Sequence, residues 1–290
     1  MSAAIRLANA DLAVEIAPLG AELVRLADAE GREYLWNGDP QWWSGRAPLL
    51  FPMVGRALGD RIKVDGRYYP MPQHGFARRS TFEIVDTTAT RAQFRLTDSE
   101  ATRAAWPFAF RLEIVYELIG ATLRTAATVF NIGQAQLPCA FGYHPAFRWP
   151  LPGASGPHEV VFEKPEPAPI RKPVNEMLSR ETFANPFASG RAIVEPEMFA
   201  GGALVFDRIE SRSVSFRAAG GPTIRLDFPT LPHFALWTKP GAPYLCLEPW
   251  QGFAAPEGFD GEYSERPGVV AIAPGASRDF PLDIVIERGR

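Results

Sequence analysis

Cysteine, histidine and long apolar runs are all scarce in this sequence. Its two cysteines, Cys139 and Cys246, are too few for a disulfide scaffold and lack the spacing of metal ligands. We expect two reduced thiols, and each lies close in sequence to a candidate functional motif described below. No stretch approaches the roughly 20 apolar residues that a membrane helix requires, and the first residues lack the pattern of a secretory signal. The chain is therefore predicted to be cytoplasmic.

The sequence also lacks a large excess of charge of either sign. The formal net charge is −3 and the isoelectric point is near 5.9. The basic field that attracts nucleic acid or an anionic membrane is absent, so a small neutral ligand is favoured over either partner. The chain is 46% hydrophobic and 22% charged, which is typical of a globular protein with a sizeable core. A monomer and a homodimer both fit this composition.

Alternating apolar residues predict β-strands along most of the chain. Residues 112–118 and 123–129 each place apolar side chains on one strand face, and we expect them to form an antiparallel pair. Residues 61–69 are predicted to form a hairpin, because Asp65-Gly66 suits the positive backbone angles of a tight turn. Further alternating runs occur at residues 12–16, 204–206, 214–216, 224–228 and 280–286.

One short helix is predicted, over Ser99–Ala105, with Asp98 as its cap and Pro107 as its stop. The 28 prolines and 25 glycines divide the apolar runs into short pieces, as expected for many strands joined by turns. Residues 150–173, rich in proline, are interpreted as a long surface excursion. These patterns favour an all-β fold, a large antiparallel sandwich with few short helices. The length allows one large domain or two small ones.

Two of the four histidines lie in local sequences that indicate a sugar site. His74 precedes Gly75 in a loop where glycine allows the backbone to approach a ligand closely; a structural loop histidine is an equal alternative. His144 is followed by Pro145 and then by aromatic residues, whose faces stack well on sugar rings. For His144 the alternative is a structural histidine at the end of a strand.

Glu248 lies in the otherwise apolar run Tyr244–Trp250, where a carboxylate is costly to bury without partners. Burial would raise its pKa toward the range useful for a general base near neutral pH. A structural ion pair is the alternative. Arg56 follows another apolar run and is a good donor for ligand hydroxyls. Two imidazoles and one carboxylate are sufficient for proton transfer without a cofactor.

Four short motifs occur along the chain in a fixed order. They are Leu50–Arg56, Gln73–Arg78, Gly142–Phe147 and Leu247–Trp250. In this order and with this spacing they resemble the aldose 1-epimerase (mutarotase) family, and most of all its bacterial LacX-like branch. The resemblance extends over nearly the whole chain. Each motif is weak alone, and their order carries the comparison.

The resemblance implies one galactose mutarotase-like β-supersandwich domain over residues 1–290, acting on free aldose sugars with no metal or other cofactor. It implies that His144 is the general acid that protonates the ring oxygen. Glu248 falls at the position of the general base, which takes the proton from the anomeric hydroxyl. His74 and Arg56 fall at substrate-binding positions.

The resemblance also places three further residues. Asp207 matches an acidic residue that holds sugar hydroxyls, with a polar residue at a strand end as the alternative. Trp237 and Phe253 are candidates for an aromatic wall, or else for the core. The segment Asn131–Pro138 lacks the Asn-His pair usual in galactose enzymes, which leaves the identity of the sugar open.

Three alternative functions follow from the same residues. A related branch resembles hexose-6-phosphate epimerases, for which Arg78 and Arg79 could bind the phosphate, although both fit an exposed charged turn equally well. A glycoside hydrolase requires two carboxylates, so Asp207 would have to assist Glu248. A carbohydrate-binding protein without turnover is the third alternative, because a fold does not determine function.

Overall fold

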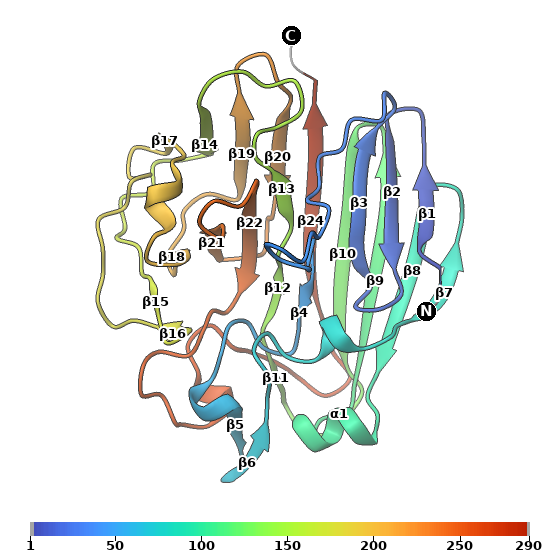
Figure 1. Ribbon diagram of the computed structural model, residues 1–290. Helices are drawn as coiled ribbons and strands as arrows, with labels where there is room; N and C mark the ends of the chain where they lie inside the picture. The colour runs from blue at the N-terminus through green and yellow to red at the C-terminus, as the bar shows by residue number, and fades with distance from the viewer. Residues whose placement is uncertain (1–2, 289–290) are drawn as a thin grey trace.

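The computed structural model describes residues 3–288, and two antiparallel β-sheets packed against each other form its main body (Figure 1). The larger sheet has nine strands and the smaller has six. In order, the nine strands are β17 (Arg191–Ile193), β14 (His158–Phe162), β19 (Ser213–Ala218), β20 (Thr223–Asp227), β24 (Ser277–Glu287), β10 (Thr122–Asn131), β9 (Phe110–Ile119), β8 (Arg91–Thr97) and β7 (Glu83–Thr87).

The six-stranded sheet carries the candidate site. Its central strand is β22, which pairs with neighbours on both sides. The strands are β18 (Leu204–Phe206), β21 (His233–Trp237), β22 (Tyr244–Gln251), β12 (Phe141–Tyr143) and β4 (Leu49–Leu50), with β13 (Ala146–Arg148) also paired to β22. All eight residues of β22 are buried, which explains its nearly continuous apolar sequence.

Smaller elements surround the two sheets. A three-stranded sheet contains β1 (Ile5–Ala8), β2 (Leu12–Ala17) and β3 (Glu22–Asp28). Three two-stranded ladders are β5 (Arg61–Val64) with β6 (Arg67–Pro70), β11 (Leu137–Cys139) with β23 (Val270–Ile272), and β15 (Pro173–Val174) with β16 (Met177–Leu178). The helices are α1 (Glu100–Ala105) and the short 3-10 turns Leu58–Asp60, Ala77–Arg79, Pro196–Phe199 and Tyr263–Glu265.

Buried tyrosine hydroxyls and aromatic stacking join the layers. Tyr143 on β12 donates a hydrogen bond to the carbonyl of Phe280 on β24, at 2.6 Å, and so connects the two large sheets. Tyr116 on β9 donates to the carbonyl of Ala21, at 2.8 Å, and connects the nine-stranded sheet to the β1–β3 layer, which lies in front of it in Figure 1. Phe141 stacks on Phe280 with ring centroids 5.1 Å apart. The layers are therefore joined by apolar packing together with buried hydroxyl-to-carbonyl hydrogen bonds.

Most of the predicted strands are confirmed. The hairpin at residues 61–69 forms as β5 and β6, and both Asp65 and Gly66 have positive φ angles. Strands β9 and β10 pair along their whole length, with buried and partly exposed residues alternating on both. The all-β sandwich predicted from the sequence is the observed fold class.

Two predictions need correction. The helix cap is Ser99, not Asp98: the Ser99 hydroxyl accepts from the Thr102 amide, and the Thr102 hydroxyl accepts from the Ser99 amide. Residues 150–173 are not only a surface excursion, because they contain β14 inside the nine-stranded sheet. Flanking prolines obscured the alternation in β14, where residues 158, 160 and 162 are buried. Among residues 3–288, no helix is long and apolar enough to cross a membrane.

Candidate active site

Strand register brings His144 and Glu248 together. On β22, Trp250 pairs with Gly142 of β12 and Cys246 pairs with Ala146 of β13. His144 occupies the break between β12 and β13, midway between these two pairs, and Glu248 lies midway between their partners. The two side chains therefore lie opposite each other although they are far apart in the sequence. Pro145 at the break keeps its carbonyl available, and it accepts a hydrogen bond from the Leu247 amide.

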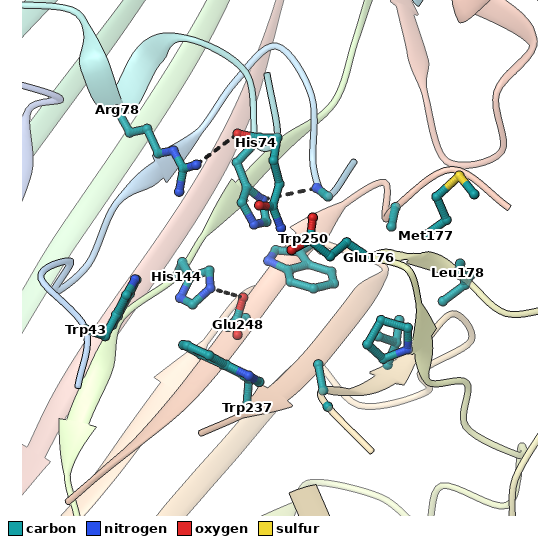
Figure 2. A pocket seen from close by; sticks show the side chains of 17 residues that line it. Trp43, His74, Arg78, His144, Glu176, Met177, Leu178, Trp237, Glu248 and Trp250 are labelled. Atoms are coloured by element: carbon teal, nitrogen blue, oxygen red, sulfur yellow. Dashed lines mark hydrogen bonds and ion pairs between the residues drawn. The ribbon is translucent and has the colours of Figure 1, made fainter. Parts of the chain in front are cut away.

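The two groups are in close polar contact and are buried. Nε2 of His144 lies 3.1 Å from Oε2 of Glu248, and the side chains face each other in Figure 2. His144 is 7% exposed and Glu248 is 1% exposed. The contact is short but not aligned as a hydrogen bond: among the described residues, neither Oε2 of Glu248 nor Nδ1 of His144 has a well-aligned partner. The pair is thus poised to accept further polar partners.

Burial determines how protons are distributed over this pair. It raises the pKa of Glu248 well above its ordinary value, and it lowers the pKa of His144 to about 3, since burial disfavours the charged form of either group. Burial therefore favours the state in which the pair carries one proton, on the carboxyl group of Glu248, over states with charged groups. An ionised Glu248 beside a protonated His144 contains the same single proton, so moving between the two states requires no exchange with solvent.

His74 is held against the same pocket by a backbone clamp. Its amide donates to the carbonyl of Gly55, at 2.8 Å, and the amide of Gly55 donates to its Nδ1, at 3.1 Å. Because Nδ1 accepts, the neutral ring carries its proton on Nε2. Burial lowers the pKa of His74 well below its ordinary value, with further contributions from His144 and Arg78. The ring stands perpendicular to that of His144, with centroids 5.8 Å apart.

Aromatic side chains form the walls of a cavity of about 350 Å³ around the pair. Trp43 lies 5.0 Å from His144 between ring centroids, and Trp237 packs edge-on against Trp43 at 5.5 Å. Trp250 completes the lining aromatic residues (Figure 2). Trp237 was expected here. Phe253 does not line the cavity and packs against His233 instead.

The polar residues at the cavity differ in part from those expected. Arg56 does not line it, because its guanidinium is paired with Asp60 and with Glu176. Asp207 also lies outside the lining, and it accepts a 2.7 Å hydrogen bond from Arg171. The polar lining residues are Gln73, His74, Arg78, His144, Glu176 and Glu248.

Sequence reasoning missed Glu176 and Trp43. Glu176 lies at the turn of the β15–β16 hairpin, which contributes Pro173, Met177 and Leu178 to the cavity lining. No local signal in the sequence marks Glu176 as part of a site. The adjacent tryptophans Trp42 and Trp43 were a usable signal, since two large aromatic residues in an irregular segment require a surface to pack on.

Cys246 adds a sulfur atom beside the pair. One ligand atom from each of His144, Cys246 and Glu248 lies within 4.8 Å of the others, and within residues 3–288 this is the one buried group with metal-ligand chemistry. Cys139 is also buried but lies on β11 and does not line the cavity. Of the two cysteines, only Cys246 is therefore close to the candidate site.

The fold and the pocket together define a galactose mutarotase-like β-sandwich with a buried histidine–glutamate pair in an aromatic-lined cavity. Residues 3–268 match the family model of aldose 1-epimerases, so the chain belongs to the aldose 1-epimerase family. A curated relative is the plasmid-encoded protein LacX of Lactococcus lactis subsp. lactis. The two are 29% identical over 296 residues, which cover 97% of this chain and 99% of the relative.

Two solved structures are similar over their whole length. A galactose mutarotase-like protein from Lactobacillus casei has a TM-score of 0.92 at 26% identity, covering 98% of this chain and 100% of that chain. A galactose mutarotase related enzyme from Lactobacillus acidophilus has a TM-score of 0.91 at 25% identity, covering 98% and 97%. The described architecture is thus shared with proteins of this kind.

Proposed function

We propose that this protein is an aldose 1-epimerase, which interconverts the α and β anomers of an aldose sugar. The observation that carries the proposal is the buried pair of His144 and Glu248, 3.1 Å apart, facing an aromatic cavity in a chain of the aldose 1-epimerase family. Anomerisation requires one group that removes a proton and one that supplies a proton. The pair provides both without a cofactor.

The proposed reaction moves one proton onto the sugar and one proton off it. Ionised Glu248 takes the proton of the anomeric hydroxyl, and the carbon–oxygen bond to the ring oxygen breaks as the aldehyde forms. Protonated His144 gives its proton to the departing ring oxygen. Rotation about the bond beside the aldehyde presents the other face of the aldehyde to the ring hydroxyl. Ring closure then reverses both transfers: His144 takes the proton of that hydroxyl, and Glu248 gives its proton to the aldehyde oxygen. The number of protons on the enzyme is unchanged after each cycle.

The surrounding residues have supporting roles in this proposal. His74 presents its Nε2–H to a sugar hydroxyl, because its Nδ1 is already bound to the amide of Gly55. Trp43 and Trp237 offer faces for the apolar side of the sugar ring and exclude water from the open-chain intermediate. Arg56 acts through Glu176 as a positioning residue at the rim.

The test is an anomerisation assay by exchange NMR or polarimetry on a panel of aldoses, with the spontaneous rate subtracted. Glu248→Gln and His144→Asn should each lower kcat by roughly a hundred- to ten-thousand-fold. Glu176→Gln is the matched control, because it removes the charge of another carboxylate on the same cavity and should retain kcat. Full activity in purified Glu248→Gln would exclude the proposed mechanism. Sugar binding without rate acceleration in the unmodified protein would favour a carbohydrate-binding protein.

One observation favours a second candidate, a sugar that carries an anionic group such as a phosphate. Arg78 lines the cavity and donates to the carbonyl of Gln73, at 3.0 Å. Among the described residues, its Nε has no hydrogen-bond partner. Arg79 is exposed and does not line the cavity. A KM for a hexose 6-phosphate far below that for the free hexose, lost in Arg78→Gln, would select this candidate.

A further inference from the structure

A sulfur, a nitrogen and an oxygen ligand lie close together beside the cavity, which His144 and Glu248 line. Cys246 and Glu248 are two residues apart on β22, so their side chains lie on the same face of the strand. His144 reaches this face from the break between β12 and β13, with its Nε2 3.1 Å from Oε2 of Glu248. One ligand atom of each residue lies within 4.8 Å of the other two.

This donor set matches the preferences of zinc and cadmium ions. Zinc sites of proteins combine cysteine sulfur, histidine nitrogen and carboxylate oxygen in a tetrahedron. With metal–ligand distances of about 2.0–2.3 Å, neighbouring ligand atoms of a tetrahedron lie roughly 3.3–3.8 Å apart. The contact between His144 and Glu248 is already that short, and Cys246, whose sulfur lies within 4.8 Å of the other two ligand atoms, needs to approach by at most about 1 Å. The fourth position would face the cavity and hold water.

An unpaired polar atom points to a ligand at this place. Oε2 of Glu248 lacks a well-aligned partner among the described residues, and the Glu248 side chain is more than nine-tenths buried. An unpaired buried carboxylate is costly, and coordination to a cation would offset that cost. His144 and Glu248 both line the cavity, so a cation can reach them from solvent through the sugar site.

We propose that a thiophilic divalent cation, Zn²⁺ or Cd²⁺, binds reversibly to His144, Cys246 and Glu248 and inhibits the protein. On binding, the S–H bond of Cys246 and the O–H bond of the Glu248 carboxyl group break, sulfur–metal and oxygen–metal bonds form, and both protons leave to solvent. Inhibition, which rests on the proposed function, follows because the cation occupies both groups that move protons. Nδ1 of His144 lacks the carboxylate or carbonyl partner that strengthens resident metal sites, so the cation acts as an inhibitor and not as a cofactor.

The first test measures binding without any activity. Titration of the purified protein with Cd²⁺ or Co²⁺ should produce a thiolate-to-metal charge-transfer absorption with one equivalent of metal. The absorption should disappear in Cys246→Ser and in Cys246→Ala, two variants that remove the thiol with different polarity. Cys139→Ser is the matched control, because Cys139 is equally buried but lies away from the cavity, and it should retain the absorption. No absorption in the unmodified protein, or an absorption that persists in both Cys246 variants, overturns the proposal.

The second test measures inhibition. Zn²⁺ should inhibit anomerisation, and a chelator should restore the rate. The inhibition constant should be at least tenfold higher in Cys246→Ala than in the unmodified protein, with inhibition measured relative to each protein's own uninhibited rate. Equal inhibition of Cys246→Ala and the unmodified protein overturns the role of the thiol. The two proposals can fail separately: a protein that binds Cd²⁺ through Cys246 but catalyses no anomerisation refutes only the proposed function, and an active protein with no metal absorption refutes only the metal site.

Discussion

The loop that carries His74 depends on Gly75, and we predict that Gly75→Ala weakens both folding and sugar binding. Gly75 has a φ angle of +72°, and a Cβ atom added there would lie 2.2 Å from the carbonyl oxygen of Phe51 and 2.7 Å from the nitrogen of Pro52. A left-handed conformation costs a residue with Cβ about 1–2 kcal/mol. Overlap with backbone atoms adds roughly 1–3 kcal/mol, because the strand cannot move freely.

The expected loss in the free energy of unfolding is therefore about 2–5 kcal/mol, measured by urea denaturation. Movement of the loop would also disturb the two hydrogen bonds between His74 and Gly55, so KM for the sugar should rise by about tenfold if one bond's contribution is lost. The control is Gly66→Ala in the β5–β6 turn, where φ is +76° and nothing lies within 4 Å of the added Cβ. A loss in Gly75→Ala no larger than that in Gly66→Ala refutes the steric argument.

Three further predictions concern other parts of the chain. Burial lowers the pKa of His233 to about 4, and its Nδ1 accepts from the Gly252 amide, so the unfolded chain binds the proton more readily than the folded one. The free energy of unfolding should therefore fall by about 2 kcal/mol from pH 7 to pH 5, and by less in His233→Gln. An equal dependence of stability on pH in the variant and the unmodified protein would count against this reasoning. Ser99→Ala should cost about 1 kcal/mol in urea denaturation through loss of the helix cap, and an unchanged midpoint would contradict the capping role. Arg56→Gln and Glu176→Gln should each raise KM less than about fivefold with kcat retained, which steady-state kinetics at low and high salt can check; a large loss of kcat would show direct participation instead.

Local chemistry explains why much of the fold could be predicted from the sequence. The β5–β6 hairpin follows from Asp65-Gly66, which tolerates positive φ, and the β9–β10 pair follows from alternation over ten residues on each strand. The helix cap was assigned one residue too early, because Asp and Ser are both good caps and the choice between Asp98 and Ser99 depends on the Thr102 partner.

The candidate site was only partly predictable, because part of it depends on contacts between residues that are distant in the sequence. Sequence reasoning identified His74, His144 and Glu248, since scarce or polar residues in apolar surroundings stand out. It could not foresee which acids would pair with arginines. Asp207 is bound to Arg171, far away in the sequence, and Arg56 is drawn to the rim by Glu176 from a distant hairpin.

The sequence by itself determined the strand-rich class, the turn positions and the residues capable of acid and base chemistry, because each of these depends on neighbours within a few positions. Only the tertiary structure decided that His144 and Glu248 form a pair and that Cys246 lies beside them. That outcome depends on the register of β22 against β12 and β13, strands that are about a hundred residues apart. Burial of the assembled pocket then shifts the proton affinities of the pair, and no local pattern in the chain encodes that environment.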